Sequence, residues 1–426
     1  MVEPRVIPRA QHVISRRDID PDALKVLYRL HRADYIAYLV GGGVRDLLLA
    51  RRPKDFDIGT SAHPYQVKKL FRNCWIIGRR FRLAHVKFGT KVIEVATFRR
   101  QLQPEEEVAR ESAPKPKGAA ASRQPPHRDN TFGTPEEDAF RRDFTINALI
   151  YDIATFSIID YVQGMDDLSA GLVRCIGEPE VRFKEDPVRM LRAIALASRL
   201  DFTVDPPILD AIRVHRNEIS QVSSARLLEE YYKILRVGSA EKTFKALAGV
   251  GLLESVSPEL HRGADEGLWR SLAAVDEYRA RFKSVPETLT NPILLGSLLV
   301  PLGLAPKQGR QVIPAGAKRA PVPRLGELPL ARRDVERLRQ IIGLQPRLRD
   351  LAASPRAKRG LTQRGIFREA LTWLEIHGNA PDVVEHWITV LTEQGTDAAP
   401  AVGAEEGVAP TQRRRRRRRR RPRPRQ

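Results

Sequence analysis

A buried-strand pattern at residues 35–40 runs directly into Gly41, Gly42 and Gly43, and this junction restricts the fold more than any other feature. Consecutive residues without side chains permit a tight turn and a close approach of other groups to the backbone. After the turn, apolar residues recur with helical spacing over residues 44–48. The order strand, glycine turn, helix predicts an α/β unit near the start of the chain.

The surrounding sequence extends this unit over about the first 100 residues. Asp20 and Pro21 open an amphipathic helical pattern, a second strand is predicted at 55–58, and a helix follows at 63–71. Alternating β-branched residues on both sides of a Gly-Thr turn predict a hairpin at 85–98. Further on, a helix near residue 136 and a strand pair at 150–162 precede long helical patterns that dominate from residue 182.

Charge and composition narrow the choice of partner. The 426 residues carry a net charge of +21, and eleven of the arginines lie between Arg413 and Arg425. Such a balance favours RNA or DNA over an anionic membrane, and no apolar run approaches the roughly 20 residues needed to span a bilayer. The two cysteines exclude a disulfide framework and favour a reducing compartment.

Asp55 and Asp57 form the sharpest chemical feature of the chain. Two positions apart on a strand, their carboxylates point to one face and lie close enough to share divalent cations. Mg²⁺ prefers oxygen ligands, and paired ions of this kind serve phosphoryl transfer. The alternative is a solvated acidic strand end. Glu94, on the following strand, either adds a third carboxylate or pairs with an arginine such as Arg82 or Arg99.

The glycine turn lies shortly before this acid pair. Its N–H groups can approach phosphates at a helix N-terminus, and Arg45 adds a cation, although the glycines alternatively make only a tight turn. A dinucleotide-binding fingerprint is excluded because Asp46 occupies its last glycine position. A Walker loop is excluded because no Gly-Lys-Ser/Thr follows.

Two later runs combine arginines with acids. Arg142 and Asp143 stand at a predicted helix start, where guanidinium groups suit triphosphate oxygens because their donors are planar and bidentate. Asp186 is predicted to cap a helix on which Arg189 and Arg192 share a face, and an Asp/Arg pair supplies the acceptor and donor that a nucleobase edge needs. Exposed helix turns with solvated charges explain the same runs equally well.

Four runs in this order, at residues 39–46, 55–57, 141–147 and 185–189, resemble the bacterial poly(A) polymerase and tRNA CCA-adding nucleotidyltransferase family. The likeness covers residues 7–200. It implies an α+β fold in which a polymerase-β-like nucleotidyltransferase head is followed by a mostly α-helical neck, body and arm and a disordered basic tail. It also implies two Mg²⁺ ions and ATP as substrate.

The resemblance assigns roles to individual residues of this chain. Asp55, Asp57 and Asp143 would be catalytic, with Asp55 and Asp57 binding Mg²⁺; Gly42, Gly43 and Arg45 would hold the triphosphate, and Arg142 would lie beside Asp143 near the ribose; Asp186 and Arg189 would read the base, with Arg192 close by. Glu94 stays a candidate third carboxylate. Relatives commonly carry another arginine three residues after the position of Arg192, where this chain has Ala195.

The expected domains follow from the same reasoning. Residues 1–20 form an N-terminal extension, 21–165 the head with a mobile insertion at about 101–135, 166–250 the neck, 251–394 the body and arm, and 395–426 the tail. A Pro/Gly/Lys-rich loop is predicted at 305–329. The arginines expected to bind RNA in the tail are Arg413, Arg414, Arg415, Arg416, Arg417, Arg418, Arg419, Arg420 and Arg421.

The expected activity is template-independent addition of AMP from ATP to RNA 3′ ends, in RNA polyadenylation and in mRNA processing and decay. Residues 76–86 resemble the stretch that marks bacterial poly(A) polymerases rather than CCA-adding enzymes. The alternatives are CCA addition to tRNA and a non-catalytic RNA-binding protein. The expected partners are ATP and the 3′ ends of mRNA, with tRNA as a further acceptor, in the cytoplasm and without a membrane.

Overall fold

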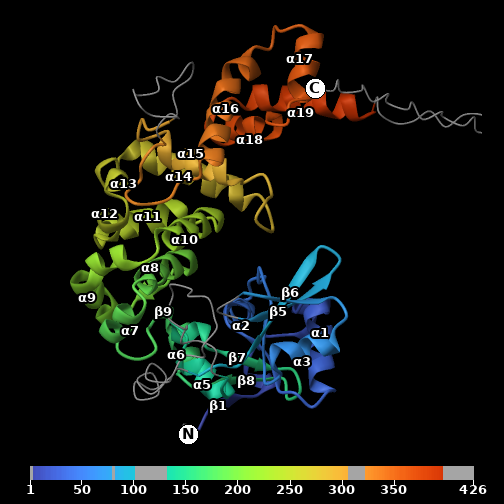
Figure 1. Ribbon diagram of the computed structural model, residues 1–426, viewed down its shortest axis with the longest axis vertical. Coiled ribbons are helices and arrows are strands. Elements are labelled where there is room, and N and C mark those ends of the chain that lie inside the picture. Colours follow the sequence, from blue (N-terminus) through green and yellow to red (C-terminus); the bar gives the residue numbers. More distant parts are fainter. Residues whose placement is uncertain (1–2, 79–81, 101–131, 306–321, 397–426) are drawn as a thin grey trace, which may run out of the picture.

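The computed structural model describes residues 3–78, 82–100, 132–305 and 322–396. Strands gather in the first 160 residues and helices follow, which confirms the predicted α+β class (Figure 1). The strands are β1 (Arg5–Ile7), β2 (Ala37–Val40), β3 (Asp57–Thr60), β4 (Cys74–Ile77), β5 (Leu83–Phe88), β6 (Lys91–Thr97), β7 (Ile150–Asp152), β8 (Ser157–Asp160), β9 (Leu172–Val173) and β10 (Thr203–Val204).

Helices begin in the head and then make up most of the chain. Those of the head and neck are α1 (Pro21–His31), α2 (Gly42–Leu48), α3 (Pro64–Leu70), α5 (Pro135–Phe140), α6 (Gly164–Ala170), α7 (Pro179–Glu185), α8 (Val188–Leu200), α9 (Pro206–His215), α10 (Ser224–Arg236) and α11 (Ala240–Gly249). Those beyond are α12 (Leu252–Val256), α13 (Pro258–Arg262), α14 (Glu266–Ala280), α15 (Asn291–Leu299), α16 (Arg332–Arg349), α17 (Pro355–Thr362), α18 (Phe367–His377) and α19 (Pro381–Thr396).

The head is built on one eight-stranded mixed sheet in the order β1-β8-β7-β2-β3-β6-β5-β4. Only β3 and β6 pair in parallel, and the other neighbours are antiparallel. The edge strand β1 comes from the segment that was expected to be an N-terminal extension, and Ile7 on it is buried. A three-residue strand is too short to show a periodic pattern, so β1 could not be predicted from residue spacing.

Local sequence explains the main elements of the head. The Asp20 side chain accepts hydrogen bonds from the N–H groups of Asp22 and Ala23 and so caps α1, as predicted. The hairpin of β5 and β6 turns at Gly89, whose φ of +59° favours glycine. Apolar residues that alternate along β5 and β6 are buried beneath α1 and α3, which fixes the sheet register.

Two large hydrophobic cores and one small cluster, made by Ala139, Ala148 and Ile176, hold the described residues together. The larger core runs from the sheet through α8 to α11 and on to α14, α15 and the start of α16. The smaller one lies among the last four helices and centres on Trp387, which is fully buried and donates a hydrogen bond to the carbonyl of Leu348. Helices α8–α11 therefore pack continuously against α14 and α15, and the last four helices have a core of their own.

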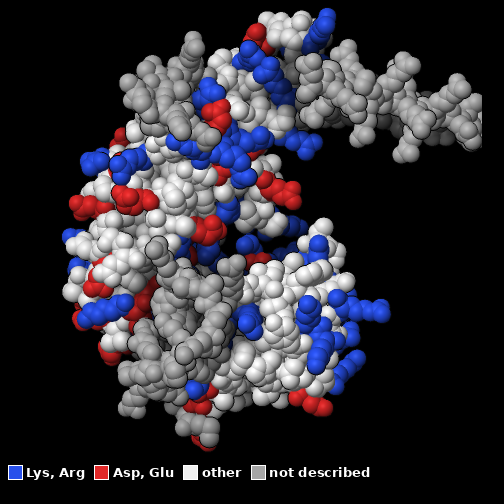
Figure 2. All heavy atoms as spheres, viewed as in Figure 1, with Lys and Arg blue, Asp and Glu red and all other residues white. Residues whose placement is uncertain are grey.

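The chain follows a curve, with the head at one end and α16–α19 at the other (Figure 1). The surface is hollowed between the head and the α14–α16 region, and Lys and Arg side chains gather around α16 and α18 (Figure 2). Across the segments that the structure covers, no helix is long and apolar enough to cross a membrane. The predicted insertion, apart from residues 132–135, and the arginine tail lie outside the described residues, as does most of the loop predicted at 305–329.

Candidate active site

The glycine turn lies between β2 and α2, and its tight packing explains the residue choice. Gly41 has a φ of +78°, and a Cβ there would lie 3.0 Å from Nη1 of Arg142. A Cβ on Gly43 would lie 3.2 Å from the carbonyl oxygen of Asp55. Side chains at these positions would push away both an arginine and the loop that carries an acid, so the turn brings separate parts of the site together.

The acid pair meets this turn, although only Asp57 is part of a strand. β3 begins at Asp57, which pairs with Val40 at the end of β2, and Asp55 lies in the preceding loop. The prediction that both acids stand on a strand was therefore wrong for Asp55. The physical reason is that β2 ends at the glycine turn, which leaves Asp55 without a strand partner on that side.

Glu94 lies beside the acid pair, as the strand register requires. β3 and β6 pair Ile58 with Val95, which places Asp57 next to Glu94 on one face of the sheet. Partial desolvation, reinforced by the Glu94 and Asp55 carboxylates, raises the pKa of Asp57 to about 6. On its other side Glu94 faces His85, with 3.5 Å between Oε1 and Nε2. Glu94 thus belongs to the same electrostatic cluster as Asp57.

This cluster has the donor chemistry of a hard-cation site. In the described segments no group of three or more His, Cys, Asp and Glu side chains is already arranged to hold a metal ion. Asp55 and Glu94 nevertheless lie close enough to Asp57 for their charges to add to the effect of desolvation in raising its pKa. A divalent cation held by these oxygens relieves the repulsion, so the residues fit Mg²⁺.

Arg45 is buried at the base of the turn and is held by two polar side chains. It donates from Nε to Oδ1 of Asp46 at 2.9 Å, and also donates to the side-chain oxygen of Asn147. Asp46 in turn accepts a hydrogen bond of 2.7 Å from Nη2 of Arg199 on α8. Burial lowers the pKa of Arg45 although Asp46 opposes that effect. The glycine turn is thereby tied to helix α8.

Arg142 is oriented from α5. Asp138, which is buried, accepts hydrogen bonds from Arg141 at 3.0 Å and from Arg142 at 2.9 Å. Arg182 on α7 donates to the backbone carbonyls of Arg141 and Arg142, at 2.9 and 2.7 Å. These contacts fix the backbone immediately before Asp143. The positive charge of Arg142 also partly offsets the desolvation and the acidic neighbours that raise the pKa of Asp57.

Asp143 connects the head to both predicted nucleotide-binding arginines of α8. Its two oxygens accept hydrogen bonds from Nε of Arg189 at 2.7 Å and from Nη1 of Arg192 at 2.9 Å. Burial would raise the pKa of Asp143, but these two guanidinium groups outweigh that effect and lower it. Glu230 on α10 accepts from the other side of Arg192 at 3.0 Å, so Arg192 is clamped between two acids.

Asp186 lies at the junction of α7 and α8 rather than in a simple capping position. Helix α8 begins at Val188, with Pro187 at its N-cap, and Val188 N–H approaches Asp186 at 3.4 Å. Both Asp186 oxygens instead accept bidentate hydrogen bonds from Arg226 on α10, at 2.9 and 2.6 Å. The predicted capping contact is thus present but long, and the main partner of this side chain is an arginine from another helix.

Five residues of this site were missed in the sequence: Asp138, Arg182, Arg199, Arg226 and Glu230. Asp138, three and four positions before Arg141 and Arg142, had a helical-spacing signal that could have revealed it. Arg226 and Glu230 lie 40 and 38 positions from their partners, Asp186 and Arg192, and residue spacing does not predict contacts over such distances in the sequence. Ala195 lies partly exposed on α8. Residues 76–86, the stretch that resembles poly(A) polymerases, are described except for residues 79–81.

Comparison with known families matches three parts of the chain. The poly A polymerase head domain matches residues 37–174, which include the turn, the acids and Asp143. The "probable RNA and SrmB- binding site of polymerase A" matches 201–263, and the "polymerase A arginine-rich C-terminus" matches 322–422. The chain belongs to the poly(A) polymerase and CCA-adding enzyme family.

Curated members of this family share much of the sequence. Poly(A) polymerase I of Salmonella typhi is 49% identical over 274 residues, which are 63% of this chain and 58% of that protein. A CCA-adding enzyme of Lactobacillus johnsonii is 37% identical over 247 residues, 58% of this chain and 57% of that protein. The matched region thus spans somewhat more than half the length of these relatives.

Solved structures of the family extend the likeness beyond the head. The CCA-adding enzyme of Bacillus stearothermophilus, in complex with CTP, has a TM-score of 0.61 at 26% identity and covers 88% of this chain and 83% of its own. The Thermotoga maritima CCA-adding enzyme, complexed with tRNA, has a TM-score of 0.50 at 18% identity over 96% and 91% of the two chains, and shows a shared fold only.

Proposed function

We propose that this protein is a polynucleotide adenylyltransferase that adds AMP from ATP to RNA 3′ ends without a template. The observations that carry the proposal are the 49% identity to a poly(A) polymerase I over 274 residues and the head-domain match at residues 37–174, which contain the acids and the glycine turn. A CCA-adding relative matches a similar length at 37% identity. The difference favours polyadenylation over CCA addition.

In this proposal Asp55 and Asp57 would hold Mg²⁺, with Glu94 as a third carboxylate beside them. The bound ions would lower the pKa of the RNA 3′-hydroxyl and neutralise the charge that develops on the phosphates. The protein's own part is to hold the acids at fixed positions: Asp57 through its pairing with Val40, and Asp55 through the packing of its backbone against Gly43. Such fixed positions supply catalysis by orientation.

The triphosphate would lie against the glycine turn. The first N–H groups of a helix have no acceptor inside the helix, and Gly42 and Gly43 are the first two residues of α2. Arg142 approaches both the turn and Asp57, so its guanidinium would contact the phosphates and counter the acid cluster. Arg45 would act mainly from beneath the turn, because Asp46 and Asn147 already hold it.

The base would be read by Asp186 and Arg189. A carboxylate accepts from an exocyclic amino group, and a guanidinium donates to the neighbouring ring nitrogen. Adenine and cytosine both present that pattern, whereas guanine and uracil present the reverse, so the pair favours ATP and CTP. Asp143 would orient Arg189 and Arg192, because each of its two oxygens accepts a hydrogen bond from one of these arginines. Asp143 would also lie near the ribose.

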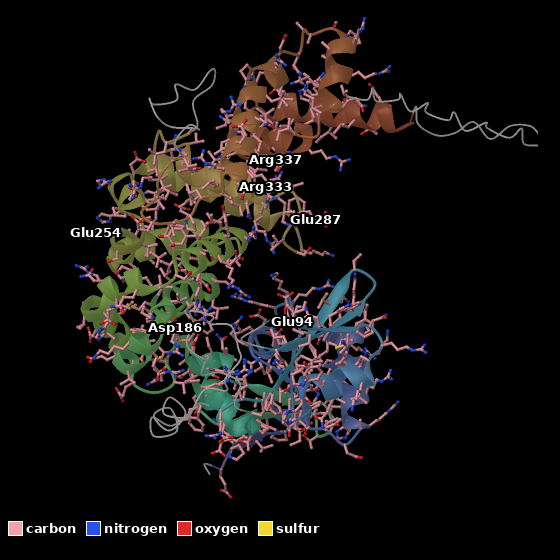
Figure 3. The ribbon with its side chains drawn as sticks, viewed as in Figure 1. Glu94, Asp186, Glu254, Glu287, Arg333 and Arg337 are labelled. Carbon is pink, nitrogen blue, oxygen red and sulfur yellow. The ribbon has the colours of Figure 1, made fainter. Side chains whose placement is uncertain are left out.

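RNA would enter through the hollow between the head and the α14–α16 region (Figure 2). Arg333 and Arg337 lie on α16 beyond that hollow (Figure 3), with their side chains 87% and 41% exposed. We further propose that residues 413–421 add affinity through counterion release. The domain division of head, neck, body with arm, and tail is proposed with the boundaries given above, and the two free cysteines suit the cytoplasm.

CCA addition is the second candidate, because the Bacillus stearothermophilus structure with CTP is similar to 88% of this chain. The base pattern read by Asp186 and Arg189 does not separate adenine from cytosine. The two candidates differ in whether CTP is used and whether addition stops at a fixed number of nucleotides.

The test of the proposed chemistry is incorporation of labelled AMP into an unstructured RNA with Mg²⁺ present. Asp55→Ala should abolish incorporation while RNA binding and the melting temperature stay close to those of the unaltered protein. Asp210→Ala, at an exposed position on α9, is the matched control and should retain activity. Normal incorporation by Asp55→Ala would remove the metal-site assignment.

A further inference from the structure

One face of the sheet is left open on the side of the acids away from the glycine turn. In β4, β5 and β6, the side chains that face α1 and α3 are buried: Cys74, Ala84, Val86, Ile93 and Val95. On the opposite face Trp75 is 51% exposed, Ile77 50% and Val92 43%. Trp75 and Ile77 share this face of β4, and Val92 lies on the same face of β6, where it pairs with Lys87 of β5. Large apolar side chains exposed on one face of a basic protein need an explanation.

The strand register connects this face directly to the acids. Trp75 is the partner of His85, His85 is the partner of Glu94, and the pairing of β3 with β6 sets Asp57 beside Glu94. Trp75, His85, Glu94 and Asp57 thus form one row across four neighbouring strands. Strands lie about 4.8 Å apart, which puts Trp75 about 14 Å from Asp57 along the row.

The geometry of phosphoryl transfer determines what must lie along that row. The attacking and leaving oxygens lie roughly in line on opposite sides of the phosphorus. The proposed triphosphate site, at the glycine turn, follows β2 on one side of β3, whereas β6, β5 and β4 lie on the other side. The attacking 3′-hydroxyl therefore approaches from the side of the open face. Figure 3 shows Glu94 on the part of the head that lies toward the hollow between the head and the α14–α16 region.

We propose that the face formed by Trp75, Ile77, Val92 and Lys87 is a stacking platform for the nucleotides just upstream of the RNA 3′ end. This inference rests on the proposed function and adds a subsite to it. Single strands bind to aromatic side chains by base stacking and to cations through their phosphates. Trp75 supplies the ring, and exposed Lys87 supplies a cation on the same face, two residues after His85.

The row also sets which nucleotides are involved. A distance of about 14 Å corresponds to roughly four stacked steps of about 3.4 Å, and to fewer steps in an extended strand. Trp75 therefore contacts a base close to the acceptor end, upstream of the reacting nucleotide. Because every base has a stacking face, the platform tolerates any acceptor sequence, as a template-independent enzyme requires.

The test compares Trp75→Ala and Trp75→Phe with Tyr65→Ala in the full chain. Tyr65 is an exposed aromatic residue on α3, which covers the opposite face of the sheet, and serves as the matched control. Loss of one base–aromatic stack should raise the KM for a short oligoadenylate about tenfold in Trp75→Ala. Trp75→Phe should recover most of that loss, and the KM for ATP should stay unchanged in all three variants.

A second readout locates the contact. Oligonucleotides that carry 2-aminopurine at the second, third or fourth position from the 3′ end should show quenching on binding at one of these positions, and Trp75→Ala should remove it. Unchanged oligonucleotide KM and quenching in Trp75→Ala would overturn the platform and leave the face to a protein partner. If the unaltered protein incorporates no AMP, the proposed function fails, whereas quenching still tests the platform by itself.

Discussion

Neutralising Asp57 should stabilise the metal-free protein above pH 6 while it destroys activity. The carboxyl has an ordinary pKa of 3.8, and desolvation together with Glu94 and Asp55 raises it to about 6 in the folded state. The folded protein therefore binds this proton more tightly than the unfolded chain does. Below about pH 4 the group is protonated in both states and carries no penalty; as pH rises through 6 the ionisation cost develops in full.

The size of this effect follows from the two pKa values. A shift of one pKa unit corresponds to about 1.4 kcal/mol, so the ionised Asp57 carboxylate lowers the free energy of unfolding by at most about 3 kcal/mol. Asp57 remains exposed to solvent, which screens the repulsion, and we expect about 1 kcal/mol. For a unit the size of the head, that amounts to a rise of about 2–4 °C in melting temperature for Asp57→Asn at pH 7.5.

The assay is thermal unfolding in EDTA at pH 4 and pH 7.5, with Asp210→Asn as the exposed-acid control. Asp57→Asn should melt higher than the unaltered protein at pH 7.5 and alike at pH 4, and the control should show no such pH dependence. Added Mg²⁺ should stabilise the unaltered protein but not Asp57→Asn. Equal melting temperatures at pH 7.5 would refute the penalty that desolvation and the neighbouring carboxylates impose on ionised Asp57.

Further changes test other parts of the site. Asp138→Ala leaves two arginines without their shared buried acid, so we expect unfolding to become easier by about 3 kcal/mol, measured by denaturant titration. Arg226→Ala releases both oxygens of Asp186 and should raise the KM for ATP about tenfold, with partial recovery in Arg226→Lys. Gly43→Ala crowds the loop before β3 and should lower kcat more than it raises the KM for RNA. Deletion of residues 413–426 should raise the Kd for RNA and flatten its salt dependence.

Each of these expectations has a contrary result. Unchanged stability of the Asp138 variant would show that solvent already compensates the two arginines. An unchanged ATP KM in Arg226→Ala would mean that Asp186 needs no fixed orientation. Full activity in Gly43→Ala would show that the packing of the turn does not determine the position of the acids. Unchanged salt dependence after the deletion would show that the tail does not contribute to RNA binding.

Features with a local cause were predictable from the sequence. The strand, turn and helix at the start of the head follow from apolar spacing and from glycines, and α1 follows from a capping aspartate. The β5–β6 hairpin follows from alternation around Gly89. In each case residues close together in the sequence determine the conformation, so the local sequence is enough to predict the element.

Features that depend on distant partners were not predictable in the same way. Asp55 leaves the strand because the partner strand β2 stops, and Asp186 orients toward Arg226 because α10 packs nearby. The clamp of Arg192 between Asp143 and Glu230 joins α8 and α10 to the segment after α5, and its two acids are 87 positions apart in the sequence. Such pairs are decided by the packing of helices, which residue spacing within one element does not encode.

The most direct test of the central claim is to supply ATP, CTP, GTP or UTP singly, each labelled, with Mg²⁺ and either an unstructured RNA or a tRNA that lacks its CCA end. The account predicts long tails from ATP alone on both RNAs. Addition that needs CTP, is confined to the tRNA and stops after a few nucleotides would contradict it and make the protein a CCA-adding enzyme.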